Sequence, residues 1–137
     1  MVHVEIVSPE RLILSEEAGA VSVPGSEGYF TVMGDHAALL TTLKPGFVTV
    51  DEGGDAHRYY VEGGFADVSP SGVTILADSA RSAGDFSPAE IEAALRRAEQ
   101  SLAAAEGIEA KDAAQYILDG WKNLMLEAAQ TGGVTPH

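Results

Sequence analysis

Cysteine is absent from this chain of 137 residues. Its absence excludes disulfide bonds and thiolate metal sites, and it leaves the redox compartment open. The four histidines are scattered singly, and none has a partner at the spacing of a zinc-binding helix; they are His3, His36, His57 and His137. We therefore expect neither a metal nor a cofactor.

Basic residues are scarce: eight Lys and Arg stand against 21 Asp and Glu, for a net charge of −13. Such a surface repels phosphate backbones and anionic lipid head groups, so we expect no nucleic acid binding and no direct lipid insertion. No stretch approaches the ~18 apolar residues of a membrane-spanning helix, and residues 1–5 lack the features of a signal peptide. These patterns indicate a protein of the cytosol, or an equivalent inner compartment. The acidic charge either serves solubility alone or suits a protein partner with a basic or neutral face.

The motifs of a catalytic or nucleotide site are also missing. Asp35 and His36 beside Thr41 could suggest a hydroxyl nucleophile with its base, but a turn capped by Asp35 explains the same residues. The glycine pairs at residues 53–54 and 63–64 lack the Lys-Ser/Thr of a phosphate-binding loop, and we predict that they are turns. The sequence therefore indicates a non-catalytic protein.

The first part of the chain has the alternation of β-strands. Val2, Val4 and Ile6 alternate with polar residues, and short strand-like stretches then recur at roughly 8–12-residue spacing, with turn residues between them. Residues 27–46 combine a Gly-Asp-His turn with a Pro-Gly stop and are predicted to form a folded corner between strands. These patterns predict an antiparallel β-sandwich or barrel over residues 1–80, of which we take the sandwich as the expected fold.

The periodicity changes after residues 78–85, which we predict to be a linker. Ser87 and Glu90 have the spacing of a capping box, with proline at the first helical position between them. Apolar residues then recur at helical spacing up to Gly107, which is expected to supply the left-handed residue that ends the helix.

A second helix is predicted from Glu109 to about residue 130, stopped by the glycines at 132–133. The connection between the helices is short, which forces them to be antiparallel. The predicted fold class is therefore α+β with two domains: a β-sandwich followed by a helical hairpin over residues 86–133, with a frayed tail at 134–137.

The helical hairpin leaves two interpretations open. Most of the apolar seam of its first helix is alanine, which allows the helix axes to approach closely but buries little area per residue. The hairpin could be an element that docks and detaches, or one that stays packed. The sequence favours neither.

Several motifs, in order along nearly the whole chain, resemble the epsilon subunit of the F-type proton-translocating ATP synthase. They are GSEG at residues 25–28, HAALLTTLKPG at 36–46, GGFADV at 63–68, VTILAD at 73–78 and RAE at 97–99. The resemblance implies a non-catalytic rotor subunit of the central stalk that packs against the gamma subunit and rests on the ring of c subunits. It also implies peripheral attachment, through the complex, at the cytoplasmic face of the inner energy-transducing membrane.

The resemblance further implies two sets of partner-facing residues. The turn expected to face the c ring consists of Ser26, Glu27, Gly28, Tyr29 and Phe30. The segment expected to lie near gamma contributes His36, Leu39, Leu40 and Thr41. Both sets fall in or beside the predicted corner.

This chain departs from the family pattern in ways that bear on function. Gly34 and Ala38 stand where the family usually has proline, so the corner is expected to be less rigid. In the family the hairpin often inhibits ATP hydrolysis by extending along gamma with basic residues aimed at acidic beta and alpha segments. Here the second helix has only Lys111 and Lys122 among several acidic residues. We therefore expect possible alpha and beta contacts by the hairpin but weak inhibition or none.

Some relatives bind ATP through Ile-Asp-x-x-Arg in the first helix. The matching stretch here, residues 91–95, has Leu95 in place of the arginine that would bind phosphate, so no ATP site is expected.

A free-standing β-sandwich that binds a small molecule or carbohydrate is the alternative. It would need an exposed aromatic platform, which Tyr29, Phe30, Tyr59 and Tyr60 could in principle supply. Strand alternation is expected to bury half of these rings, and this alternative gives the helical hairpin no purpose.

Overall fold

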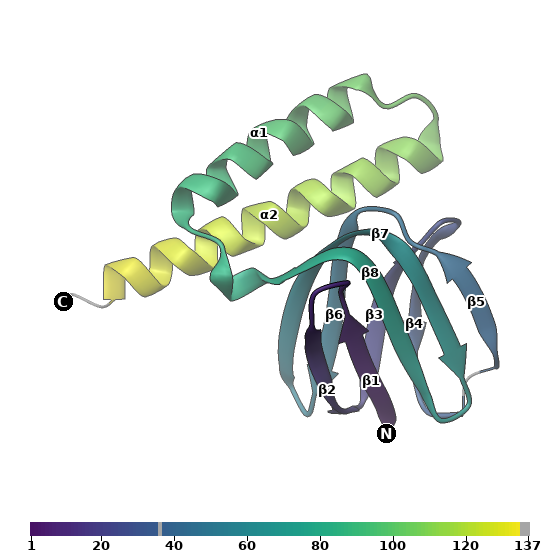
Figure 1. Cartoon of the computed structure of the whole chain (residues 1–137). Helices are drawn as coiled ribbons and strands as arrows, with labels where there is room; N and C mark the ends of the chain where they lie inside the picture. Colours follow the sequence, from purple (N-terminus) through teal and green to yellow (C-terminus); the bar gives the residue numbers. More distant parts are fainter. Residues whose placement is uncertain (36, 135–137) are drawn as a thin grey trace. The chain divides into compact units, whose positions relative to one another are not determined.

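The computed structural model describes residues 1–35 and 37–134, with the side chains of the last helix as far as Leu126. By its internal contacts the chain divides into two compact units, Met1–Asp85 and Phe86–His137. The first is built of strands and the second of two helices (Figure 1). The strands are β1 (Val2–Val7), β2 (Leu12–Ala18), β3 (Ala20–Gly25), β4 (Gly28–Val32), β5 (Leu39–Thr42), β6 (Gly46–Glu52), β7 (Asp55–Ser69) and β8 (Gly72–Ser82).

The strands are hydrogen-bonded in the order β2-β1-β8-β7-β6-β3-β4, and β5 pairs with β7 off this path. All pairs are antiparallel except β1 with β8, which is parallel. The predicted β-sandwich is thus confirmed, with one parallel pair in place of a wholly antiparallel arrangement. A parallel pair is possible because β1 and β8 lie far apart in the sequence, so no tight turn has to join them.

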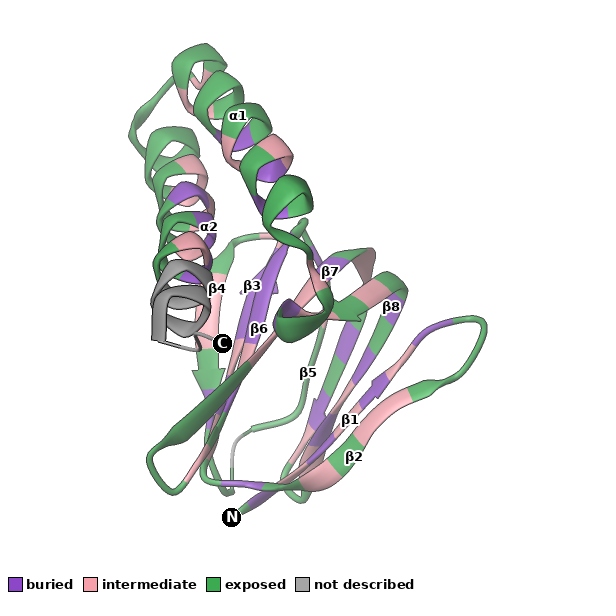
Figure 2. Cartoon of the chain, turned by 90° about the vertical axis from the view of Figure 1, so that its left-hand side faces the viewer, coloured by how far each residue is buried: buried purple, intermediate pink, exposed green. Residues whose placement is uncertain are grey.

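The core of the sandwich consists mainly of valine. Alternate residues of each strand face inward, so Val2, Val4 and Ile6 of β1 are fully buried while the residues between them face outward. Figure 2 shows the same alternation of buried and exposed residues along the other strands. Branched residues suit this position because they fit the pleated surface of a strand.

The long strand β7 changes partners halfway along. Its first half pairs with β6 and its second half with β5, in one unbroken register. Gly63 and Gly64 lie at the change, with φ of +71° and +109°, and a Cβ atom at Gly64 would overlap the carbonyl oxygen of Leu76. The prediction of a turn at this glycine pair is therefore wrong. Glycine is needed there because the strand bends while another backbone approaches closely.

Two other expectations for the sandwich have different outcomes. Gly53 and Gly54 do form the turn between β6 and β7, both with positive φ. The predicted linker at residues 78–85 is wrong, because β8 continues to Ser82 in register with β7 and a 3₁₀ helix, η1 (Ala83–Asp85), follows it. The prediction relied on the serines of residues 78–85, which are common in linkers but also fit an exposed strand.

The second unit contains α1 (Pro88–Ala104) and α2 (Ile108–Val134). The capping box is confirmed: Glu90 N–H donates to the Ser87 hydroxyl at 3.2 Å, and Ser87 N–H donates to the Glu90 carboxylate at 2.9 Å. Gly107 has a positive φ of +87°, but the prediction that it ends the first helix is wrong, because α1 ends at Ala104 and its C-cap is Ala105 in an extended conformation. The predicted stop at residues 132–133 is wrong, because α2 runs through both glycines to Val134. The tail predicted at residues 134–137 is wrong at Val134, which is the last residue of α2, and its residues 135–137 lie outside the described residues.

The helices meet through small and large apolar residues. Ile91, Ala94 and Ala98 of α1 are buried, and on α2 the buried residues include Trp121, whose ring meets that of Phe86 edge to face at 5.1 Å between centroids. Over the described part of the chain, neither helix combines the length and apolar character needed to cross a membrane.

Candidate protein interfaces

The turn expected to face the c ring is the connection between β3 and β4. Ser26 and Glu27 form its two central residues, and Gly25 pairs with Gly28 across it. Gly28 has φ +123°, a value that L-residues with side chains rarely adopt. Glu27 and Gly28 are exposed and Ser26 is half-buried, so the tip of this hairpin is free to meet a partner.

Tyr29 and Phe30 are less available than the tip. The backbone N–H of Phe47 donates to the Tyr29 hydroxyl at 3.1 Å, and this hydroxyl lies so close to Gly46 that a Cβ atom there would overlap it. The Phe30 ring lies over Gly25 and packs against the core. Tyr29 and Phe30 therefore pack against the sandwich at the base of the hairpin and do not form an exposed aromatic platform.

The segment expected to lie near gamma contains β5, a strand that the sequence did not predict. Leu39 and Leu40 are 41% and 68% exposed, and Thr41 is half-buried. His36 lies outside the described residues. Asp35, directly before it, has φ +62° in a turn, a conformation that aspartate tolerates better than most residues.

The two predicted interfaces adjoin one another. Ser26 N–H donates to the carbonyl oxygen of Thr42 at 2.9 Å, and the hydroxyl groups of Ser26 and Thr41 lie 3.3 Å apart. On the other side of Gly25, Lys44 N–H donates to the carbonyl oxygen of Pro24 at 2.9 Å. Hydrogen bonds thus join the β3–β4 turn directly to β5 and to the residues that follow it.

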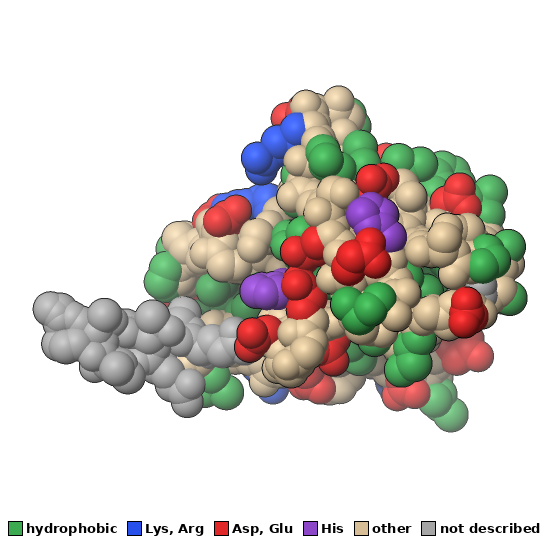
Figure 3. All heavy atoms as spheres, turned by 90° about the horizontal axis from the view of Figure 1, so that it is seen from below, with side chains coloured by type: hydrophobic (Ala, Val, Ile, Leu, Met, Phe, Trp, Pro, Cys, Tyr) green, Lys and Arg blue, Asp and Glu red, His purple; other side chains and the backbone are tan. Residues whose placement is uncertain are grey.

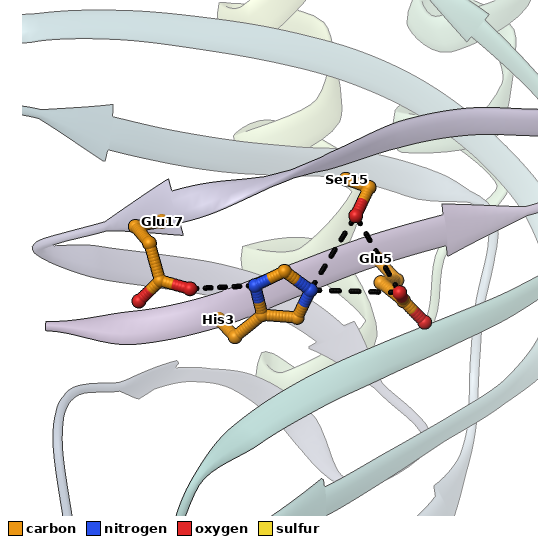
Figure 4. Close-up of polar contacts among 4 residues, drawn as sticks. All are labelled: His3, Glu5, Ser15 and Glu17. Atoms are coloured by element: carbon orange, nitrogen blue, oxygen red, sulfur yellow. Dashed lines mark hydrogen bonds and ion pairs between the residues drawn. The ribbon is translucent and has the colours of Figure 1, made fainter.

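A polar cluster that no sequence pattern predicted surrounds His3 on the outer face of β1 and β2. His3 Nδ1 lies 2.6 Å from Glu17, and its Nε2 lies 3.5 Å from Glu5 and 3.4 Å from the Ser15 hydroxyl (Figure 4). The hydrogen bond to Glu17 is the main reason that the pKa of His3 is raised above its ordinary value of 6.5. A spacing of 14 residues between His3 and Glu17 carries no sequence signal, because the strand register alone makes them neighbours.

This cluster has the members of a serine–histidine–carboxylate triad but not its chemistry. Two carboxylates and a raised pKa favour the protonated imidazolium, which cannot act as a base. Ser15 also donates to Glu5, at 3.5 Å, and the site is exposed to water. Among the described residues no group of His, Asp and Glu could hold a metal ion.

A row of apolar side chains, also unforeseen, crosses the same outer face. In the strand registers Leu12 is opposite Val7, Val7 opposite Leu76, and Leu76 opposite Phe65. Leu12, Leu76 and Phe65 are 55%, 48% and 49% exposed. We call these four residues the outer row. Cross-strand partners share a face, so only the register reveals that residues from four strands lie side by side.

Comparison with known proteins identifies the family. The family model described as "ATP synthase, Delta/Epsilon chain, beta-sandwich domain" matches residues 1–83. The chain is 44% identical to the ATP synthase epsilon chains of Mesorhizobium japonicum and Brucella anthropi, each over 115 residues that cover 83% of this chain and 85% of the relative.

Solved structures share the fold. A chain of the Euglena gracilis mitochondrial ATP synthase structure "OSCP/F1/c-ring in rotational state 1" matches at a TM-score of 0.63 and 23% identity, covering 94% of this chain and 81% of that one. A chain of the Tetrahymena thermophila mitochondrial ATP synthase "central stalk/cring" structure matches at 0.52 and 16%, covering 93% and 95%. The resemblance seen in the sequence is confirmed, and a free-standing carbohydrate-binding module is not favoured. The chain belongs to the family of ATP synthase epsilon chains, which are non-catalytic subunits of the central stalk.

Proposed function

We propose that this chain works in the rotor by joining the gamma subunit to the ring of c subunits through two adjoining contacts, and so helps to couple proton flow to ATP synthesis. The hairpin from Ser26 to Phe30 is the proposed c-ring contact. The proposed gamma contact consists of Leu39, Leu40 and Thr41 of β5, together with His36, which precedes this strand in the sequence.

The observation that carries this proposal is the direct connection between the two contacts. Ser26 belongs to the c-ring hairpin and Thr41 to the gamma-facing strand, and their hydroxyl groups lie 3.3 Å apart. Two backbone hydrogen bonds flank this pair. A load applied at one contact would therefore reach the other through a short, hydrogen-bonded path, as a coupling part requires.

The proposed location is the cytoplasmic face of the inner energy-transducing membrane, with attachment through the ATP synthase complex. The acidic surface of the chain supports attachment through protein, because anionic lipid head groups would repel it. Acidic side chains are spread over the sandwich in the view of Figure 3, with histidine side chains among them.

The helical hairpin is proposed to contact the alpha and beta subunits weakly and to inhibit hydrolysis little or not at all. Lys111 and Lys122 are exposed on α2, but Asp112 and Asp119 are exposed on the same helix. A helix with mixed charge has little net attraction for an acidic partner.

Cysteine cross-linking in the assembled complex tests the two contacts. The chain has no native cysteine, so Glu27→Cys and Leu40→Cys each introduce one reactive thiol at an exposed site. We expect Glu27→Cys to cross-link to the c ring and Leu40→Cys to gamma. Ala56→Cys, exposed beside the β6–β7 turn, is the control and should reach neither. If the first two variants match the control, the assignment is wrong.

A further inference from the structure

We propose that β2 is an edge strand whose attachment depends on two protons: one on Glu16 fastens its inward face to β6, and one on His3 fastens its outward face to β1. Loss of these protons as the pH rises lets β2 open locally while the rest of the sandwich stays folded. The contacts lie within the unit Met1–Asp85, so this property belongs to the chain itself and requires no partner.

The strand β2 is weakly held by its backbone. It lies at the end of the strand order, and among the described residues it pairs only with β1. The register of that pair also shifts between Ile6 and Val7. A strand held along one edge opens at a lower free energy than a central strand. Contacts made by the side chains of β2 therefore decide how firmly it is attached.

Glu16 is a half-buried carboxyl group on the inward face of β2. In the register it lies opposite the fully buried Val4, and Ala18, two positions further along the same face, is buried in the core. An inward-pointing charge on an edge strand hinders pairing with a second chain. Here the side chain also has a partner, because it forms a hydrogen bond with the carboxyl group of Glu52, the last residue of β6.

The backbone brings these two carboxyl groups together where the chain passes from β2 to β3. Gly19 N–H donates to the carbonyl oxygen of Asp51 at 2.8 Å, and β2 contacts β6 although the two are not neighbours in the strand order. Two carboxyl groups can share a hydrogen bond only when one of them is protonated. The hydrogen bond to Glu52 is accordingly the main reason that the pKa of Glu16 is raised above its ordinary value of 4.5.

Other titratable groups surround this pair. The charge of His57 opposes the raised pKa, because a positive charge favours the ionised form of Glu16. Asp51 and Arg58 lie on the opposite faces of β6 and β7, since the residues that alternate with them are buried. The groups on the side of Glu16 are therefore mostly acidic; they are Glu52 of β6, Asp55, His57 and Tyr59 of β7, and Asp85 of η1.

The outward face of β2 is held in the same way. Ser15 and Glu17, on either side of Glu16 in the sequence, both lie at the ring of His3 (Figure 4). The charged residues that face His3 are acidic: Glu5 of β1, Glu17 of β2, and Asp67 of β7, which lines the same hollow. Three consecutive residues of β2 thus take part in two proton-dependent contacts, one on each face of the strand.

Both protons act in the same direction. Each pKa is raised in the folded state, so its contribution to stability is full below the ordinary pKa, 4.5 for Glu16 and 6.5 for His3. That contribution is lost as the pH rises through the raised pKa. The attachment of β2 is therefore firmest in acid. Above both raised values, β2 keeps its backbone pairing with β1 while the carboxylates of Glu16 and Glu52 repel one another.

Amide hydrogen exchange of the full-length chain, followed by NMR from about pH 4.5 to 8.5, tests the inference. Protection factors, which correct for the intrinsic effect of pH on exchange, should fall in β2 by about tenfold, with about threefold from each proton. The strand β4, at the other end of the strand order, is the internal control. Its protection should change less than about twofold, because neither proton lies in its pairing with β3.

Two variants separate the contributions. Glu16→Gln carries N–H donors at every pH, so it should remove about threefold of the change and protect β2 better than wild type at the alkaline end. His3→Gln should remove the other part. Should Glu16→Gln fold poorly by circular dichroism, Glu52→Gln replaces it, because its amide removes the repulsion. Glu62→Gln, at an exposed carboxyl group of β7, is the matched control and should leave the whole change in place.

The inference is overturned if the protection of β2 in the wild type does not change with pH. It is equally overturned if Glu16→Gln and His3→Gln both retain the change seen in Glu62→Gln, because the protons would then lie elsewhere. A fall of equal size in β4 would show that the whole sandwich loosens, which also contradicts a local opening of β2.

Discussion

The hydroxyl groups of Ser26 and Thr41, 15 residues apart in the sequence, lie 3.3 Å apart where the β3–β4 turn meets β5. The pair joins the proposed c-ring contact to the proposed gamma contact. Its strength can be measured with Ser26→Ala, Thr41→Val and the double variant by urea unfolding. We expect a coupling energy of about 0.5–1 kcal/mol, typical of a partly buried neutral hydrogen bond. Additive losses in the two single variants would show that the hydroxyl groups do not interact.

Gly64 should tolerate no side chain. Gly64→Ala places a Cβ atom into the carbonyl oxygen of Leu76 and holds alanine at φ +109°, so we expect the free energy of unfolding to fall by about 3 kcal/mol or more. Gly53→Ala is the matched control, because Gly53 also has positive φ but open space around it; about 1 kcal/mol is expected there. Equal losses of unfolding free energy in the two variants would contradict the close approach of the Leu76 carbonyl oxygen to Gly64.

His3 should titrate above its ordinary pKa of 6.5, mainly because of its hydrogen bond to Glu17. Since the pKa is raised in the folded state, the stabilisation is full below 6.5 and is lost as pH rises through the raised pKa. NMR titration should show that Glu17→Gln lowers the pKa of His3. The free energies of unfolding of wild type and His3→Gln should converge as the pH rises past the raised pKa of His3. A His3 pKa that is unaffected by Glu17→Gln would disprove the contact.

Removing the helices should leave the sandwich intact. A chain of residues 1–85 keeps the whole compact unit Met1–Asp85, so we expect cooperative unfolding and retained binding to the complex, with ATP hydrolysis raised less than about twofold. A chain of residues 1–80 is the comparison and should be less stable, because it removes the paired end of β8. A several-fold rise in hydrolysis would show that the hairpin inhibits.

Ser87→Ala removes one half of the capping box and should cost about 1 kcal/mol of helix stability. The loss should appear as increased amide exchange in the first turn of α1, with the sandwich unchanged. Ser101→Ala, at an exposed position inside α1, is the control, and it should not increase exchange because alanine is the better helix former there.

Local chemistry was readable in the sequence wherever a few adjacent residues decide the structure. The capping box at Ser87 and the Gly53–Gly54 turn are of this kind, and the alternation of Val2, Val4 and Ile6 placed β1 correctly. Gly63–Gly64 carries the same local signal as Gly53–Gly54, yet it lies inside a strand, because β5, β6 and β8 are present to pair on both sides.

The candidate interfaces were predictable only in part. The family motifs located the hairpin at Ser26 and the segment at Leu40, but they could not show that Tyr29 folds back onto Gly46. The outer row and the His3 cluster depend on registers between strands far apart in the sequence. No local pattern specifies those registers, because they are set by the burial of the opposite face.

The change of partners along β7 has a mechanical consequence. One uninterrupted backbone belongs to both layers of the sandwich, and β8 accompanies it along nearly its whole length. The layers therefore cannot slide past one another without breaking the ladder between these two strands. A twisting force delivered at β5 is carried into the layer of β6 and β3 by covalent bonds as well as by packing, so the domain would turn as a stiff body.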